Sequence, residues 1–523
     1  MLTSLNSHEE EEDPDRHHHH HRNPARGLPS PANHVRQLLI SCAELISQSD
    51  FAAARRIVSL LSASSSPYGD STDRVVHQFT KALNIRINRH TFQNLISSSS
   101  SPTPSISTNP DTLQSAYLTL NQITPFIRFS HLTANQAILE AIEGHRHIHI
   151  LDFNTMQGVQ WPPLMQAIAE GSDPLNPPSI RITGTGHDLE TLQRTGHRLQ
   201  TFAQSLGLNF QFYPLHIDDG PSSTTVLHLL SSINVVPEEM LAVNCVLYLH
   251  KLLKDDERDV RLFLRTIKAM NPKVVTVAER EARHNHPIFL QRFMEALDYY
   301  TAGFDSLEAT LPPNSQERLT VEQVWFGNEI ANIVAAEGEE RRERHERFES
   351  WVEMMRSSGF ANVPLSPFAL SQAKLLLRLH YPSEGYQLQL VNDSFFLGWQ
   401  NKALFSVSSW DHLVAHVACK TLEEATATFS PLPPFSAFML LHFFQASVGR
   451  ELKLKYKYFC LFLSLLLRKS CCTHLSLSHM YMYIYIYIYI SSCINSLVIL
   501  KQIVFCLPRS NQLCCGIFKS HIP

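Results

Sequence analysis

Five short apolar runs, rich in Val, Ile and aromatic residues, recur between residues 147 and 279, and helical patterns separate them. The runs lie at 147–153, 179–185, 209–215, 240–249 and 273–279. Strands that alternate with helices favour a parallel sheet, because each right-handed crossover returns the chain to the same edge. The spacing therefore predicts an α/β fold with a mostly parallel sheet covered by helices on both faces.

The residues on either side of this pattern are mainly helical. Residues 34–145 carry amphipathic repeats such as 35–48, interrupted by a Ser- and Pro-rich loop at 97–111. We expect them to form an N-terminal helical cap, and residues 146–410 to form the core. A long charged helix is predicted at roughly 321–358, followed by a C-terminal hairpin that ends at Trp410.

Charge is distributed unevenly along the 523 residues. The whole chain has a net charge of −4, but residues 1–410 carry −10 and residues 411–523 carry +6. An acidic domain argues against strong non-specific binding to nucleic acid. Only Cys42 and Cys245 precede residue 411, which fits a reducing compartment better than a disulfide framework.

The two ends of the chain differ in composition from the rest. Residues 1–33 contain an acidic run, five consecutive histidines (17–21) and several prolines, so we expect them to be disordered. Residues 481–490 read YMYIYIYIYI, and 470–500 lack any Lys, Arg, Asp or Glu. Length alone would suggest a membrane anchor there. Translation of a TATA repeat explains the Tyr-Ile alternation better, so residues 411–523 are interpreted as an aberrant tail, an artefact of the gene model.

The first strand and the loop after it raise the question of a cofactor. HIHILDFNTMQGVQWPP, residues 147–163, runs from an apolar strand through Asp152 into a polar loop and a helix. Sites for dinucleotides or methyl donors need two or three glycines in this loop, so that backbone N–H groups can approach the ligand. Gly158 is the single glycine here. A methyltransferase-like enzyme with a degenerate donor site remains the alternative to a non-catalytic scaffold.

Other polar groupings carry weaker indications of chemistry. His145, His147 and His149 alternate, but no further ligand lies at metal-binding spacing, so we expect no metal there. Glu279, Arg280 and Glu281 end the fifth run, where catalytic acids often lie, and a structural ion-pair cluster is the preferred interpretation. No catalytic, cofactor-binding or metal-ligating residue is therefore assigned.

Several of these segments together resemble the plant GRAS family of transcriptional regulators. Residues 148–152, with His149 and Asp152, are similar to its VHIID motif, and Gln157, Gly158, Trp161 and Pro162 follow in the family's manner. Residues 272–282, with Arg280 and Glu281, resemble its PFYRE region. Leucine-rich stretches near 35–90 and 189–230 resemble its two heptad regions.

The C-terminal part resembles the SAW region of the same family. The matching positions are the pairs Arg344 and Glu349, Trp351 and Gly359, and Trp399 and Trp410, with the closing residues Ser408, Ser409 and Trp410. Trp399 and Trp410 should be largely buried, because a large aromatic on each limb can fix a terminal hairpin to the sheet. Within the family, the sequence is most similar to the Lateral suppressor branch, which is linked to axillary meristem formation.

This resemblance implies a methyltransferase-like Rossmann core with an N-terminal helical cap over residues 34–410, without catalysis or cofactor. It implies a nuclear transcriptional regulator that acts through protein–protein contacts in axillary meristem and shoot development. Its partners would be other transcription factors or GRAS proteins, bound through the cap and the leucine-rich regions, including homo- or heterodimers. Contact with promoter DNA would be indirect or weak, and no membrane or small-molecule substrate is expected.

Overall fold

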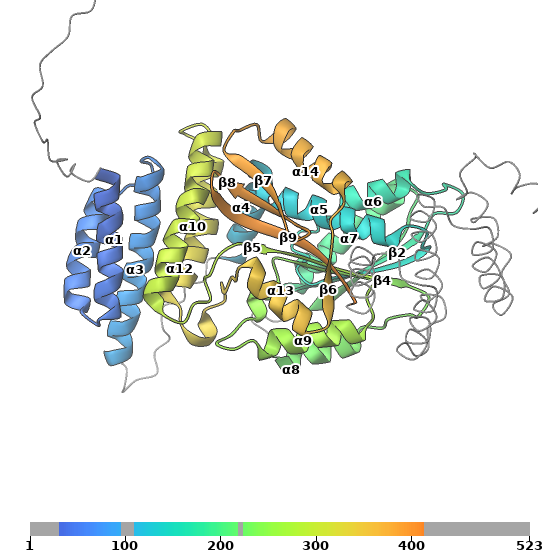
Figure 1. The fold of residues 1–523 in the computed structure, drawn as a ribbon, viewed down its shortest axis with the longest axis horizontal. Coiled ribbons are helices and arrows are strands. Elements are labelled where there is room, and N and C mark those ends of the chain that lie inside the picture. Colours follow the sequence, from blue (N-terminus) through green and yellow to red (C-terminus); the bar gives the residue numbers. More distant parts are fainter. Residues whose placement is uncertain (1–30, 96–108, 218–222, 413–523) are drawn as a thin grey trace, which may run out of the picture. The chain divides into compact units, whose positions relative to one another are not determined.

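The computed structural model describes residues 31–95, 109–217 and 223–412 (Figure 1). The expectations for the acidic and histidine-rich N-terminus, for most of the loop at 97–111 and for the tail after residue 412 lie outside these residues. The described residues belong to one compact unit.

One nine-stranded sheet forms the core, with the order β3-β2-β1-β4-β5-β9-β8-β7 and β6 paired to β9. All five strands predicted from the apolar runs are present, and they run parallel to one another. They are β1 (His147–Asp152), β2 (Ser179–Gly186), β3 (Asn209–His216), β4 (Met240–Val246) and β5 (Val274–Arg280). The order reverses between β1 and β4, which is the switch point at which Rossmann-like folds bind ligands.

The remaining strands extend the sheet in the antiparallel sense beyond β5. They are β6 (Phe360–Val363), β7 (Tyr386–Val391), β8 (Ser394–Trp399) and β9 (Lys402–His412). The C-terminal hairpin is thus confirmed, with β7 as an additional limb. The last strand continues two residues beyond Trp410 and pairs there with β6.

Helices cover both faces of the sheet. One apolar cluster joins the sheet to α5 (Pro125–Ile142), α6 (Trp161–Glu170) and α7 (Leu189–Ser205). A second joins the opposite face to α8 (Ser223–Ser232), α9 (Arg258–Ala269) and α13 (Phe348–Ser357). Central strands are buried on both faces, which is why β4 and β5 are mostly apolar in the sequence and do not alternate between apolar and polar residues. The expected α/β class with a mostly parallel sheet is confirmed.

The helical unit at the N-terminus is built from distant parts of the chain. The N-terminal helices α1 (Pro31–Ser47), α2 (Phe51–Ser64) and α3 (Ser71–Leu95) pack with α10 (Phe289–Thr310) and α12 (Gly327–Ala335). A buried ion pair, Arg74 to Glu322, joins α3 to a π-helical turn, η2 (Val321–Phe326), at an N–O distance of 2.7 Å. By contrast, α4 (Pro110–Ile123) lies against η2, and α5 lies against the sheet.

The predicted single helix at 321–358 is wrong. The segment instead contains η2, α12, the short 3₁₀ turn η3 (Gly338–Glu340), an irregular stretch and then α13. Helix α12 ends at Ala335 because Ala336 is extended, and Gly338, with φ +56°, begins η3. The irregular stretch lets the buried Arg341 and Arg344 reach partners on other elements, namely the carbonyl of His284 and the side chain of Asp255. These tertiary contacts of the two buried arginines outweigh the helical propensity of the charged residues.

The expected burial of the two tryptophans of the closing hairpin is confirmed. Trp399 on β8 is 4% exposed and Trp410 on β9 is fully buried. They belong to different clusters, Trp399 to the one that contains the helical unit and Trp410 to the one beneath α9 and α13. They therefore do not meet, and each anchors the hairpin to a different layer.

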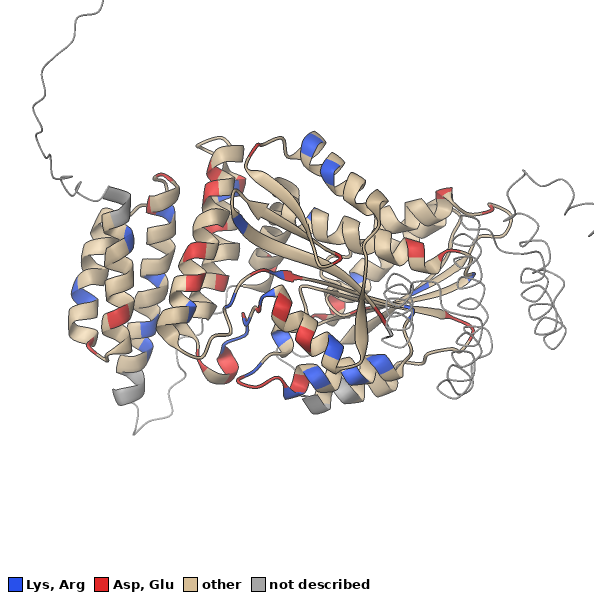
Figure 2. Cartoon of the chain, viewed as in Figure 1, with Lys and Arg blue, Asp and Glu red and all other residues tan. Residues whose placement is uncertain are grey.

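Three short elements complete the described chain: η1 (Leu249–Leu252), α11 (Gln316–Thr320) and α14 (Pro367–His380). Among the residues described, no helix has the length and apolar character needed to cross a membrane. Acidic residues gather along α10 and basic residues along α9 (Figure 2). The basic residues Arg258 and Arg261 of α9 are paired with Asp256 and Glu257 just before them.

Candidate functional site

The Asp152 side chain lies at the centre of a hydrogen-bonded junction at the carboxyl end of β1. Its Oδ1 accepts from Nδ2 of Asn244 on β4 at 3.0 Å, and its Oδ2 accepts from Nε1 of Trp161 on α6 at 2.9 Å. Burial raises the pKa of Asp152, and these two donors counteract the shift. The carboxylate thus joins the strand, the loop and the first turn of α6.

A second layer of amides holds Asn244 in place. The side chains of Asn244 and Gln160 exchange two hydrogen bonds of 3.0 and 3.1 Å, and Thr276 of β5 donates to Asn244 at 2.9 Å. The side-chain amide of Gln160 also donates to Oδ1 of Asn135 on α5, and the backbone carbonyl of Gln160 accepts from Nδ2 of Asn135. Each of these buried polar groups has a partner, as a low-dielectric interior requires. The network fixes three strands and two helices at the edge where such folds bind ligands.

The loop between β1 and α6 is shaped by its own backbone and by α7. Gly158 has φ +66°, and a Cβ there would lie 2.6 Å from Cγ2 of Thr195, so no side chain fits. Gln157 donates to Gln114 of α4 at 2.8 Å and accepts from Arg198 of α7 at 2.9 Å. Pro162 lies in the first turn of α6, where its missing N–H costs no helical hydrogen bond.

The space that a nucleotide or methyl donor would need beside β4 is filled by side chains. Nδ2 of Asn154 donates to the carbonyls of Val246 and Leu247, each at 3.2 Å, which ties the loop to the end of β4. The ring of Phe153 stacks on Tyr248 with centroids 5.1 Å apart and meets Phe263 edge-on at 4.8 Å. These residues do not fit such a cofactor, because the glycine cradle is missing and the side chains of Phe153 and Asn154 pack against the end of β4 and the residues after it.

His149 is held as a neutral structural side chain. A guanidinium can only donate, so Arg181, its cross-strand neighbour, donates to Nδ1 at 3.0 Å, and Nε2 carries the proton that faces Thr183 at 2.9 Å. Burial and the positive charge of Arg181 lower the pKa of His149 to about 4. The three alternating histidines do not converge, since His145 and His147 are exposed.

The three charged residues at the end of β5 are all engaged, and the first of them, Glu279, accepts from Nδ1 of His250 at 2.7 Å. Arg280 forms a buried ion pair with Glu329 of α12, and its guanidinium lies 5.2 Å from the ring centre of Phe405. The Glu281 carboxylate accepts from the backbone N of Phe348 at 3.1 and 3.2 Å, at the start of α13. Burial raises the pKa of Glu281 to about 7.

The residues that match the SAW region are spread over α13 and the segment before it. Arg344 and Glu349 do not form one helical pair: Arg344 precedes α13 and donates to Asp255 and Asn285, whereas Glu349 lies exposed in the first turn. Trp351 is buried and donates to the carbonyl of Glu346 at 3.0 Å. Gly359 turns the chain from α13 into β6 with φ +93°.

The closing residues of β9 are buried and bonded to one another or to neighbouring strands. Nε1 of Trp410 donates to Oγ of Ser408 at 2.8 Å. The carbonyl of Ser409 accepts from Asn362 of β6 at 3.1 Å. All three residues therefore stabilise the junction of β9 with its neighbours.

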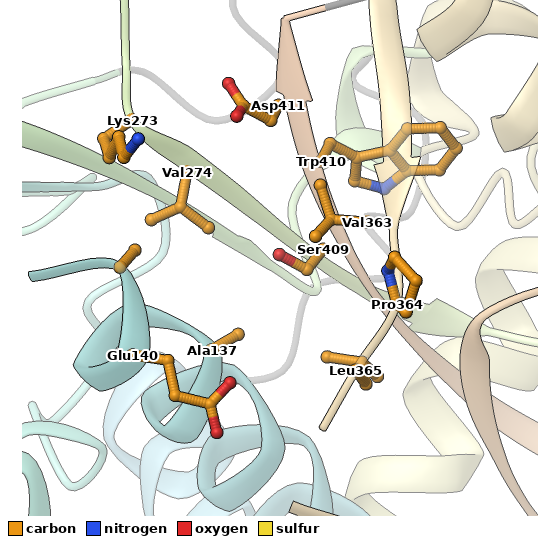
Figure 3. Close-up of a pocket in the computed structure, with 11 residues that line it drawn as sticks. Ala137, Glu140, Lys273, Val274, Val363, Pro364, Leu365, Ser409, Trp410 and Asp411 are labelled. Carbon is orange, nitrogen blue, oxygen red and sulfur yellow. The ribbon is translucent and has the colours of Figure 1, made fainter. Parts of the chain in front are cut away.

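A hollow of about 220 Å³ lies at the opposite edge of the sheet, at the start of β5 (Figure 3). Its walls come from α5, β5, β6 and β9, and include Glu140, Lys273, Trp410 and Asp411. Ligands of open α/β sheets bind outside the carboxyl ends of the parallel strands. The hollow therefore does not replace the filled donor position.

Sequence patterns alone did not reveal two groups of residues. Asn244 and Gln160 complete the Asp152 junction, and His250, Glu343 and His345 gather at the carboxyl ends of β4 and β5. The two parts of the second group are more than 90 residues apart in the sequence, so no spacing rule connects them. Only the Glu-x-His spacing of Glu343 and His345 in RERHE, residues 342–346, is visible locally.

Comparison with known proteins agrees with this architecture. The GRAS domain family model matches residues 35–411. The chain is 54% identical to Scarecrow-like protein 18 of Arabidopsis thaliana over 404 residues, covering 72% of this chain and 91% of that protein. It is 46% identical to Protein MONOCULM 1 of Oryza sativa subsp. japonica, covering 72% and 88% respectively.

The fold comparison gives the same result. The crystal structure of SCL7 in Oryza sativa superposes with a TM-score of 0.60 at 35% identity, over 72% of this chain and 99% of that chain. Together with the motifs and the strand order, these matches establish that the chain belongs to the GRAS domain family, a family of plant transcriptional regulators and not of enzymes.

Proposed function

We propose that this GRAS regulator acts in the nucleus as a scaffold for partner proteins in axillary meristem and shoot development. The observation that carries the proposal is the filled edge of the sheet around Asp152, Asn154 and Phe153. A core that keeps the Rossmann framework but packs side chains into the donor position is suited to display surfaces and not to turn over a substrate. The similarity to Scarecrow-like protein 18 and MONOCULM 1 supports the developmental role.

The partners we propose are other transcription factors or GRAS proteins, including a second copy of this chain, bound through the helical cap and the leucine-rich regions. Two large apolar side chains support the cap as a contact surface: Leu60 on α2 is 64% exposed, and Tyr68 in the following turn is 74% exposed. Exposed apolar residues at a polar rim are typical of protein-binding surfaces. Contact with promoter DNA is indirect or weak, in line with the acidic charge of residues 1–410.

A reporter assay in plant protoplasts tests the scaffold role. The full chain is tethered to a promoter through a fused DNA-binding domain, and reporter output is compared with the tether alone. The double substitution Leu60→Glu and Tyr68→Glu should return output to the level of the tether. Phe368→Ser on α14, also exposed, should leave output unchanged. Equal output from the double variant and the wild type contradicts the cap as the partner surface.

Localisation and developmental role need separate tests. A fluorescent fusion of the full chain should accumulate in nuclei. Expression of the chain in a plant whose corresponding GRAS gene is disrupted should restore axillary shoots. A fusion that stays out of the nucleus, or plants that express the protein but form no additional axillary shoots, would count against the proposal.

The alternative is a methyltransferase-like enzyme with an atypical donor loop. Isothermal calorimetry with S-adenosylmethionine separates the two functions, because the filled donor position predicts no binding at physiological concentrations. Micromolar binding that disappears in Asp152→Ala would establish a donor site and overturn the scaffold proposal.

A further inference from the structure

A group of imidazole and carboxylate side chains lies at the carboxyl ends of β4 and β5, apart from the Asp152 junction. Nε2 of His250, Oε2 of Glu343 and a ring nitrogen of His345 lie within 4.8 Å of one another. Oε2 of Glu343 is 3.2 Å from Nε2 of His345 and 3.7 Å from Nε2 of His250. Tetrahedral zinc, with bonds of about 2.0–2.2 Å, separates neighbouring ligand atoms by about 3.3–3.5 Å, so the spacing is close to that of a metal site.

Oε2 of Glu343 and Nε2 of His345 form a close ion-pair contact that is not aligned as a full hydrogen bond. Nε2 of His345 is fully buried and, among the described residues, has no hydrogen-bond partner, although Glu343 is 3.2 Å away. A buried polar atom left unsatisfied is costly. Ligands that point toward a common centre, instead of at one another, show this combination of short distances and unmade hydrogen bonds.

The outer ring nitrogens have the partners that metal-binding histidines need. Glu279 accepts from Nδ1 of His250 at 2.7 Å and from its backbone N at 3.3 Å. Nδ1 of His345 lies 3.0 Å from Nδ1 of His284. Because the Glu279 carboxylate accepts a hydrogen bond from Nδ1–H, His250 is fixed as the tautomer with a lone pair on Nε2, and this lone pair is directed at Glu343. A nitrogen lone pair and a carboxylate oxygen repel each other, and a cation bound between them would remove this repulsion.

The charge balance points the same way. Arg280 is paired with Glu329 and also acts on Glu343, so the two carboxylates on either side of His250, Glu279 and Glu343, are only partly offset. A divalent cation held by two neutral imidazoles would balance these two carboxylates. The Glu343 side chain is 20% exposed, which leaves a route from solvent to the group.

We propose that His250, Glu343 and His345 form a binding site for one divalent transition-metal cation, with zinc as the best match. Two imidazoles and one carboxylate are a known zinc ligand set, which leaves one coordination position for water or a partner's side chain. Glu279 and His284 are positioning residues for His250 and His345. The cation ties η1 to the irregular segment before α13, two elements that no strand or helix connects directly.

The test uses the full chain in a background with each of the five histidines of the N-terminal run replaced by Asn, because His17 to His21 would bind metal on their own. The protein is stripped with a chelator, dialysed against zinc and measured for bound zinc and for thermal unfolding. The background protein should retain one more zinc equivalent than His345→Gln or Glu343→Gln, and zinc should raise its Tm reversibly. His228→Gln, an exposed histidine on α8, is the matched control and should keep both properties.

Two further measurements keep the test decisive if the buried variants do not fold, or if cysteines of the tail also bind metal. Cobalt binding to the unsubstituted background should give the visible bands of a low-coordinate nitrogen and oxygen site that lacks thiolate charge transfer. Glu279→Gln should weaken zinc binding about 10–100-fold while leaving the ligands in place. Absence of such a cobalt spectrum, or equal zinc content and equal Tm response in background and folded variants, overturns the proposal.

Discussion

Trp410→Ala tests whether the tryptophan near the end of β9 is essential for the stability of the domain. The indole is fully buried in the cluster beneath α9 and α13, and its Nε1 donates to Ser408 at 2.8 Å. Truncating a buried Trp to Ala costs about 3–5 kcal/mol through lost apolar burial and the cavity left behind. Typical domains have a total stability of about 5–15 kcal/mol, so this loss is a large part of the whole.

The assay is thermal and urea unfolding of the full chain. At about 2 °C per kcal/mol for a domain of this size, Tm should fall by roughly 5–10 °C. Trp410→Phe, which keeps most of the ring but loses the hydrogen bond, should cost only about 1–2 kcal/mol. Leu379→Ala on α14 is the control, since that side chain is 60% exposed and should change stability by no more than about 0.5 kcal/mol.

The competing hypothesis is that Trp410 is an anchor for a partner protein, as tryptophans at interfaces often are. It predicts an unchanged unfolding curve together with lost partner binding or reporter output. That combination would refute the structural argument and move Trp410 to the interaction surface. A fall in stability with unchanged binding per folded molecule would support the structural role.

Three other changes test the junction, the buried acid and the tail. Asp152→Ala removes the acceptor of Asn244 and Trp161 and should cost about 2–5 kcal/mol by urea unfolding; a loss below 1 kcal/mol would show that the junction is dispensable. Burial raises the pKa of Glu281 from 4.5 to about 7. The cost in folding stability of burying its charged form therefore grows as pH rises between these two values. Glu281→Gln should therefore gain up to about 3 kcal/mol over wild type by pH 8 and nothing at pH 4, and a pH-independent difference contradicts the shift. Ending the chain after residue 412 should leave Tm unchanged, because β9 is complete there; a lower Tm would make the tail structural.

The sequence by itself determined the α/β class and the positions of the parallel strands. Strands buried on both faces are rich in apolar residues, so β1, β4 and β5 are visible as apolar-rich runs, although a few buried polar residues such as Asp152 and Asn244 lie within them. The single glycine of the loop also predicted that no donor cradle would form, since backbone cannot approach a phosphate or ribose without glycine. These features depend on local composition and on chain order, which a sequence displays directly.

Only the tertiary structure decided which polar groups meet. Asn244 reaches Asp152 from 92 residues away, and His250 reaches Glu343 from a similar separation. The helix expected at 321–358 is broken for the same reason, because buried Arg341 and Arg344 gain more from distant acceptors than from continuing a helix. Propensity acts between neighbours along the chain, whereas burying a charge requires a partner wherever the fold supplies one.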